Sequence, residues 1–164
     1  MSTLLGLVFG EYFGVIPITA FTRKSGPSNA ATPEWADKNG VRIIFANEAE
    51  FNDHLLVGEM KSKTGKEFII ARPLFCAPFK YMPMFKIVIT CNTKPNVQTS
   101  PFDNGTWRRI LVLLFGSKFV EDNPKGDRQF LIDETLDDDF PDWRQPFMWL
   151  LINKYYEVYE KKIS

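Results

Sequence analysis

The stretch MFKIVITCNTKPNVQTSPFDNGTWRRILVLLF, residues 84–115, decides the fold. Its first run, Phe85–Cys91, is rich in β-branched and aromatic residues, which predicts a strand buried on both faces. A second such run, Ile110–Phe115, predicts another buried strand. The prolines and the glycine between the runs favour an irregular connection. The stretch therefore predicts two strands of an α/β sheet joined by a polar loop.

Polar side chains stand where these two predicted strands meet the loop. Asn92 directly follows the first strand, and ligands of open α/β sheets bind outside the carboxyl ends of the strands. Arg108 and Arg109 directly precede the second strand. Taken singly, such an asparagine is also typical of a turn, and an arginine pair is also typical of a solvated strand entrance. The two features together, at this spacing, favour a functional site.

Three segments carry a family resemblance. CNTKP at residues 91–95, GTWRRILVLLF at 105–115 and SKFVEDNP at 117–124 resemble the superfamily 3 helicases, above all the poxvirus-type primase-helicases of large DNA viruses and phages. In that family an asparagine senses the γ-phosphate or the attacking water. An arginine of the following motif reaches the nucleotide of a neighbouring subunit. The resemblance implies these roles for Asn92 and for Arg108 or Arg109.

The first residues allow two interpretations. Apolar residues at helical spacing over residues 1–13, followed by Gly14, predict an ordinary amphipathic helix. The sequence STLL after Met1 also resembles the residues that come directly after Gly-Lys in a phosphate-binding loop, G-x-x-x-x-G-K-[ST]. The resemblance implies that Ser2 and Thr3 are nucleotide-binding residues and that Ser2 contacts Mg²⁺ held with ATP. It also implies a helicase core truncated inside this motif, with Met1 in the place of the lysine.

A second strand with polar residues at its end lies earlier in the chain. Val41–Ala46 predicts a buried strand that runs into Asn47 and Glu48, which resembles a Walker B motif. In such a motif the first acid holds Mg²⁺ through water and the second polarises the attacking water. Glu48 matches the second acid, whereas Asn47 lacks the charge of the first and puts metal binding by this motif in doubt. Polar residues after a strand are also common in solvated loops.

Basic residues around a predicted hairpin are the candidates for DNA contact. The resemblance implies a lysine, a Gly-Gly-Asp-like turn and an Ala-Arg pair ahead of a hairpin that points into the pore of a hexamer. Here the turn is TGKE at 64–67, and the hairpin pairs Phe68–Phe75 with Phe79–Lys86. Because DNA contact is electrostatic at the backbone, the DNA-facing candidates are Lys61, Lys66, Arg72 and Lys80. A solvated lysine-rich turn is the alternative.

Composition limits the class of protein. The chain has 164 residues, 45% hydrophobic and 24% charged, which fits one domain-sized folded unit and excludes disorder as the main state. Its net charge is zero, so any DNA contact must come from a local patch. Two cysteines suggest a reducing compartment, and neither a signal peptide nor a membrane span is recognised. We expect a cytoplasmic protein, in the host cytoplasm or at a viral replication site, that is not secreted and has no membrane partner.

The remaining stretches predict short elements and a terminal helix. His54 is the single histidine, and no Cys/His metal spacing or G-x-S-x-G element is present. The acidic run at 137–139 is typical of a solvated face rather than a metal site. The other predicted elements are a strand at 15–21, a helix from Thr32 and Pro33 to Gly40, a helix at 52–64, an acidic helix and turn at 133–142, and a long helix at 142–163.

The fold predicted is α/β, a P-loop NTPase core of the AAA+ kind with a central, largely parallel sheet, lacking its first strand and phosphate loop and followed by C-terminal helices. The core is expected over residues 1–120 and an acidic, helical segment over 121–164. The resemblance implies part of an ATP-dependent replicative DNA helicase that forms a hexameric ring on single-stranded DNA. ATP and Mg²⁺ are expected in the intact enzyme, and neither in this chain alone. The alternative is a catalytically inactive remnant or fragment that acts as an oligomerisation or DNA-binding module.

Overall fold

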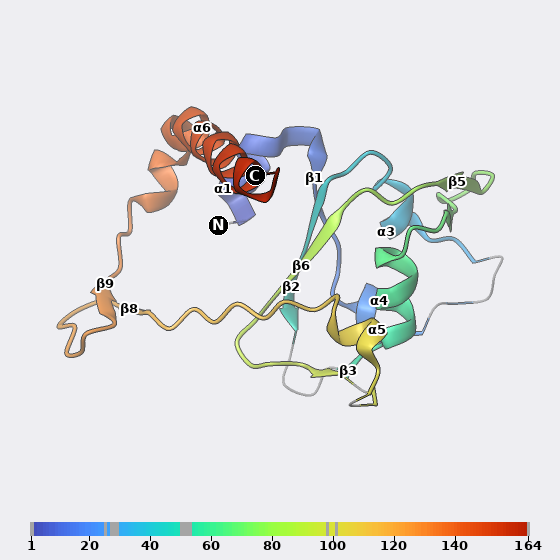
Figure 1. Ribbon diagram of the computed structural model, residues 1–164, viewed down its shortest axis with the longest axis horizontal. Coiled ribbons are helices and arrows are strands. Elements are labelled where there is room, and N and C mark those ends of the chain that lie inside the picture. The colour runs from blue at the N-terminus through green and yellow to red at the C-terminus, as the bar shows by residue number, and fades with distance from the viewer. Residues whose placement is uncertain are drawn as a thin grey trace. The chain divides into compact units, whose positions relative to one another are not determined.

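The computed structural model describes residues 2–24, 26, 30–49, 54–97, 99–100 and 102–163, without the side chains of residues 48, 49 and 160–163. The chain divides into two compact units, Phe9–Ile110 and Met1–Val8 with Leu111–Ser164. Helices and small, mostly parallel sheets occur together (Figure 1), which confirms the predicted α/β class. The P-loop core and the boundary after residue 120 stay predictions.

A parallel sheet of three strands organises the larger unit. Its strands are β1 (Phe13–Val15), β2 (Ile43–Ala49) and β6 (Lys86–Cys91), in the order β1-β2-β6. The two longer strands were predicted, and both are confirmed. Among the described strands β6 pairs only with β2, so its side chains are half-buried or exposed instead of buried on both faces.

Strand β2 is the centre of this sheet and has apolar neighbours on both faces. Ile44 and Ala46 are fully buried and belong to the main hydrophobic cluster of the unit. Phe45 alternates with them, is 2% exposed, and has its ring centroid 5.4 Å from that of Phe13. Because successive side chains of a strand point to opposite faces, both faces of β2 are covered. This explains why its apolar run is unbroken from Ile43 to Ala46.

Short helices flank the sheet: η1 (Gly10–Tyr12, a 3₁₀ turn), α2 (Thr19–Thr22), α3 (Pro33–Ala36), α4 (Val57–Thr64) and α5 (Asn104–Trp107). In Figure 1, α3 and α4 lie on one side of the sheet. Helix α3 begins at the predicted position, with Pro33 in its first turn. The side chain of Thr32 does not cap it, because its Oγ1 accepts a hydrogen bond from the backbone N of Arg72 at 3.0 Å.

In the larger unit, two predicted elements have bounds in the structure that differ from the predicted ones. Helix α4 ends before Gly65 as predicted, but it begins at Val57, because residues 54–55 form β3 (His54–Leu55), which pairs with β7 (Asn96–Val97). The strand predicted over residues 15–21 is wrong. The chain is extended only over β1 and then turns into α2, since Pro17 has no N–H to donate to a ladder.

The predicted hairpin is present and is shorter than expected. Strand β4 (Ile69–Ala71) pairs antiparallel with β5 (Phe79–Tyr81). The residues of one face, Ile69, Ala71 and Tyr81, are buried, whereas Ile70 and Lys80 on the other face are exposed. The hydroxyl of Tyr81 donates a hydrogen bond of 2.7 Å to the backbone O of Trp35. The hairpin is therefore held against α3.

The smaller unit contains two helices and one pair of strands. Helix α1 (Ser2–Phe9) confirms the predicted N-terminal helix, although Gly14 does not end it: the helix gives way to η1 at Gly10, whose φ of +53° suits glycine. Val8 of α1 lines one small hollow together with Met148 and Trp149 of α6 (Leu136–Ile163). Strands β8 (Lys118–Val120) and β9 (Gln129–Leu131) pair with each other in parallel.

The acidic segment and the long helix predicted after it form one helix. Helix α6 runs without a break from Leu136 and contains Pro141 and Pro146. The acidic run at 137–139 is therefore its first turn, where negative charge favours the helix dipole, and these side chains are exposed as predicted. Within the described residues, no helix has both the length and the apolarity that crossing a membrane requires.

The second strand predicted in the stretch 84–115 is wrong. Residues 110–115 form no strand, and Leu111, Leu114 and Phe115 are 81%, 91% and 78% exposed. None of the described strands pairs with residues 111–117. Apolar, β-branched composition gives a segment the propensity for a strand, but the ladder also needs a neighbouring backbone.

Candidate functional site

The carboxyl edge of the three-stranded sheet brings together two of the predicted positions. Strands β2 and β6 are parallel, so their carboxyl ends meet at the same edge. Ala46 pairs with Ile89 and Ala49 with Cys91, so that Asn47 and Glu48 together face the single residue Thr90. This is a bulge, a feature over-represented next to active sites because it redirects side chains. The backbone of Glu48 is thus placed at the edge, while its side chain lies outside the described part of the chain.

Asn47 is tied to the neighbouring strand. Its Oδ1 accepts a hydrogen bond of 3.0 Å from Oγ1 of Thr90, and both residues are exposed. The amide carries no charge, as the sequence shows, and its oxygen is already engaged. Asn47 therefore fixes the bulge to β6 and leaves the position without the charge that a first Walker B acid would supply.

Asn92 lies directly after the end of β6, as predicted from the sequence, and is exposed. It follows Cys91, which pairs with Ala49 on the other side of the bulge. The edge thus presents one amide side chain next to the Asn47–Glu48 bulge. An amide can donate hydrogen bonds to an anion or a water molecule, so the arrangement fits a site that senses a phosphate.

A hydrogen-bond network centred on Asp103 lies between this edge and the arginine pair in the chain. Nζ of Lys61 lies 2.7 Å and 3.0 Å from the two carboxylate oxygens of Asp103. Thr99 and Thr106 each donate a hydroxyl hydrogen bond of 2.9 Å to it. The hydrogen bonds from Lys61, Thr99 and Thr106, in that order, hold the pKa of Asp103 well below its usual range. The network joins α4 to the loop that starts α5.

Asp103 was not predicted from the sequence, although a local signal was present. Aspartate is one of the preferred residues at a helix N-cap, and Asp103 accepts a hydrogen bond of 3.2 Å from the backbone N of Thr106. What the sequence could not give is the partner from α4. Lys61, predicted to face DNA, has its ammonium group held by a carboxylate of its own chain. Its role in DNA contact stays a prediction.

The arginine pair comes directly after this network in the chain. Both Arg108 and Arg109 are exposed, and neither forms one of the salt bridges found among the described residues. A guanidinium N–H of Arg109 donates to the backbone O of Gly105. A Cβ at Gly105 would lie 3.2 Å from the Asp103 carboxylate, 3.6 Å from Arg109 and 3.7 Å from Lys61 Nζ, so these groups crowd around the glycine. The fold leaves the pair accessible to another molecule, and its role as a finger stays a prediction.

The other predicted DNA-facing residues are spread over the hairpin. Lys66 is exposed in the turn after α4, and Lys80 is exposed on the outer face of β5. Arg72 follows β4 and is half-buried; its Nε donates a hydrogen bond of 3.2 Å to the backbone O of Cys76. The structure therefore places Arg72 and Lys80 on one hairpin, with Lys66 in the preceding turn.

The residues predicted to hold ATP and Mg²⁺ include two at the start of the chain. Ser2 and Thr3 lie in the first turn of α1, in the smaller unit, with Ser2 half-buried and Thr3 exposed. Among the described residues, no group of three acidic, histidine or cysteine side chains could hold a metal ion. The contacts predicted between the sheet edge and the γ-phosphate also stay a prediction. The residues that would hold Mg²⁺ stay a prediction.

Comparison with known proteins points to large DNA viruses. Three relatives share the name "Putative helicase". The one from Acanthamoeba polyphaga mimivirus is 36% identical over 98% of this chain, the one from Invertebrate iridescent virus 6 is 33% identical over 90%, and the one from Frog virus 3 is 32% identical over 73%. The matches cover 17%, 16% and 12% of those proteins, so the chain spans about a sixth of their length or less. No protein-family model matches the chain. The relatives support a viral helicase family.

Proposed function

We propose that this chain is part of an ATP-dependent replicative DNA helicase of a large DNA virus, of the superfamily 3, AAA+ primase-helicase type. The observation that carries the proposal is the bulge that sets Asn47 and Glu48 beside the end of β6 and Asn92. Ligands of parallel α/β sheets bind at this edge, and the two strand ends that meet there are the ones whose sequences resemble helicase motifs. The viral relatives add independent support.

In the proposed reaction this chain's residues position water and phosphate. The Glu48 carboxylate polarises the attacking water, and the Asn92 amide donates a hydrogen bond to the γ-phosphate or to that water. Mg²⁺ bound with ATP would offset the charge of the phosphates, and the Ser2 hydroxyl would contact it. Arg108 or Arg109 stabilises the transition-state charge in a neighbouring subunit of a hexameric ring, where such an arginine is worth about 10³–10⁵ in rate.

Hydrolysis would drive movement along single-stranded DNA. The hairpin β4–β5 is the element proposed to grip the strand in the centre of the ring, with Lys66, Arg72 and Lys80 as its basic contacts. Such contacts bind backbone phosphates and read no sequence. A replicative helicase needs this property because it must translocate over every sequence of a genome.

A catalytically inactive module for oligomerisation or DNA binding is the second candidate. One observation favours it: Asn47 stands where an acid is expected, and its oxygen is used within the sheet. The coding sequence in frame ahead of Met1 separates the two functions. A G-x-x-x-x-G-K motif there indicates an enzyme, and a stop codon without the motif indicates the inactive module.

The enzymatic test uses the protein extended by that upstream segment, with phosphate release measured in the presence of single-stranded DNA. Glu48→Gln keeps the shape of the side chain and removes its charge, so we expect ATP binding without turnover. Asn92→Ala should also slow hydrolysis, because the amide no longer contacts the phosphate. Glu134→Gln, at an exposed residue in the turn before α6, is the matched control and should leave the rate unchanged. A Glu48→Gln enzyme with the parent rate would contradict the proposed site.

A further inference from the structure

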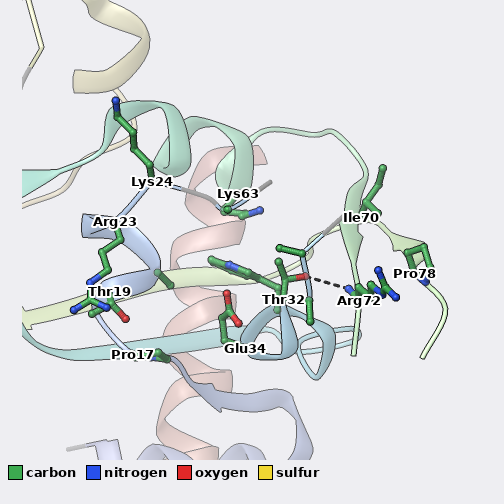
Figure 2. A pocket seen from close by; sticks show the side chains of 15 residues that line it. Pro17, Thr19, Arg23, Lys24, Thr32, Glu34, Lys63, Ile70, Arg72 and Pro78 are labelled. Atoms are coloured by element: carbon green, nitrogen blue, oxygen red, sulfur yellow. Dashed lines mark hydrogen bonds between the residues drawn. The ribbon is translucent and has the colours of Figure 1, made fainter. Parts of the chain in front are cut away.

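The larger unit contains a hollow with a basic lining that lies outside the sheet edge described above. Its volume is about 920 Å³, and it is formed by α2 and described residues between α2 and α3, by α3, by α4 and by the hairpin. Figure 2 shows its lining side chains. A volume of this size is typical of ligand-binding clefts in proteins.

The lining carries a strong excess of positive charge. Arg23, Lys24, Lys63 and Arg72 line the hollow, and Glu34 is the single acid among the described residues of its lining. The whole chain has 20 basic and 20 acidic residues and therefore no net charge. The four cations and one anion therefore form a local cluster of positive charge, although the chain as a whole is neutral. Such a concavity attracts an anionic ligand.

The floor of the hollow is an aromatic ring, that of Trp35, and no face of this ring is open for a ligand to stack on. Trp35 is only 4% exposed. Lys63 Nζ lies 4.7 Å from the centroid of the Trp35 ring, and the same ring stacks with Phe85 at 6.1 Å and meets Phe21 edge-on at 5.7 Å. A nucleic-acid base would find no free aromatic face here, so a ligand would meet the cations through phosphate groups.

Lys63 lies against this floor. Burial lowers the pKa of its ammonium group, while the charges of Glu59 and Glu34 act in the opposite direction. A partly desolvated ammonium has lost part of its hydration, so an incoming phosphate would find less water to displace there.

The rim residues are set at different places around the hollow. Arg72 is anchored by its backbone, since its N donates to Oγ1 of Thr32 and its O accepts from the Thr32 N at 2.8 Å. Arg23 and Lys24 are exposed at the end of α2. In Figure 2, Arg23 and Lys24 lie on one side, Arg72 on the opposite side and Lys63 between them. The charges are spread along a path and do not converge on one point, which suits an extended polyanion better than a single phosphate ion.

We propose that this hollow binds the phosphodiester backbone of a single-stranded nucleic acid, with successive phosphates running from Arg23 and Lys24 past Lys63 to Arg72. The inference rests on the proposed helicase function and adds to it a second length of the strand's path, away from Lys66 and Lys80. Binding is independent of base identity. Three to four phosphate contacts to a single strand give a slope of about −2 to −3 in log affinity against log salt.

The test measures binding of a fluorescein-labelled oligothymidylate to the full chain by anisotropy at several salt concentrations. The double variant Arg23→Gln/Lys24→Gln removes two charges from the rim, and Lys118→Gln/Lys125→Gln removes two exposed charges that lie outside the hollow and outside the residues proposed to contact DNA. We expect the first to weaken binding about tenfold and to reduce the salt slope by about 1.4, which is two contacts of 0.7 each. The second should stay within about twofold of the parent.

Four results would overturn the hollow as the binding site. Equal losses in both variants would indicate general electrostatic attraction. A loss in a third variant, Lys66→Gln/Lys80→Gln, without a loss in Arg23→Gln/Lys24→Gln would place the strand on the hairpin alone. Tripolyphosphate or ATP could displace the labelled oligonucleotide at a lower concentration of phosphate groups than unlabelled oligothymidylate does. This result would assign the hollow to a small phosphorylated ligand. Lack of binding by the parent chain would also reject the hollow. The helicase proposal would survive each of these results if the extended protein hydrolyses ATP and depends on Glu48.

Discussion

Two segments of nearly the same composition have different structures in this chain. Residues 43–46 read IIFA and form the buried centre of a sheet, whereas residues 110–115 read ILVLLF and form no strand, with Leu114 91% exposed. The first segment has a paired strand on each side, β1 and β6. The second pairs with none of the described strands. Apolar composition therefore predicts the propensity for a strand, and the presence of neighbours decides whether the strand forms.

The largest expected effect is the difference in unfolding free energy between a truncation in the first segment and one in the second. Ile44→Ala removes a fully buried side chain from the core and should cost about 2–5 kcal/mol in the free energy of unfolding. Leu114→Ala removes an exposed side chain and should stay within about 0.5 kcal/mol. Urea denaturation of the chain measures both. A loss in Leu114→Ala as large as that in Ile44→Ala would mean that residues 110–115 are buried in solution.

A smaller effect is expected at the hairpin, whose packing depends on one buried hydrogen bond. Tyr81→Phe removes the donor to the Trp35 backbone O and should cost about 1 kcal/mol at neutral pH, since that oxygen also accepts from the backbone N of Lys38. Urea denaturation checks this value. Tyr12→Phe, at an exposed tyrosine, is the control.

The same tyrosine predicts a stability change at high pH. Burial, aided by the charge of Asp37, raises the pKa of Tyr81 to about 12. The unfolded chain releases this proton near pH 10 and the folded chain does not, so the contribution is complete below about pH 10 and is lost as the pH rises toward 12. Tyr81→Phe should remove this part of the alkaline loss. Identical alkaline profiles in the parent and the variant would contradict the assignment.

The Asp103 network predicts a loss of stability at low pH instead of at high pH. The pKa of its carboxyl is lowered in the folded state, so the unfolded chain binds the proton first, and the stabilising contribution is present above about pH 4 and is lost as the pH falls further. Asp103→Asn should flatten the acid side of the stability curve, measured by urea midpoints from pH 7 to pH 3. Asp127→Asn, an exposed aspartate, should keep the parent's slope. Parallel curves for the parent and Asp103→Asn would show that the network does not stabilise the fold.

Much of the larger unit followed from local sequence. The strands β2 and β6, the start of α3, the end of α4 and the hairpin β4–β5 were all predicted, because each has an apolar run or a Pro or Gly at its boundary. The sequence also predicted that Asn92 follows a strand. Its placement beside Asn47 and Glu48 depends on the parallel register of β2 and β6, which neither segment specifies alone.

The features that the sequence could not predict depend on distant contacts. Lys61 and Asp103 are 42 residues apart, and a lysine gives no local sign that it will be held by a carboxylate. The basic hollow likewise assembles Arg23 and Lys24, Lys63 and Arg72 from three separate elements. In the sequence Arg23, Lys24 and Lys63 are typical of ordinary solvated positions, and Arg72 was the one DNA-facing candidate among the four. Only the fold brings them around one cavity.

The measurement that tests the central claim most directly mixes subunits of the extended protein. An Arg108→Ala/Arg109→Ala subunit retains Glu48, and a Glu48→Gln subunit retains both arginines, so a site shared between neighbours can be complete only in mixed rings. With single-stranded DNA present, we predict that the mixture releases phosphate faster than the sum of the rates that the two variants show separately at the same dilution. The triple variant, which supplies neither group, should restore nothing. Activity that never exceeds that sum at any mixing ratio would contradict a nucleotide site built from the sheet edge of one subunit and the arginine pair of the next.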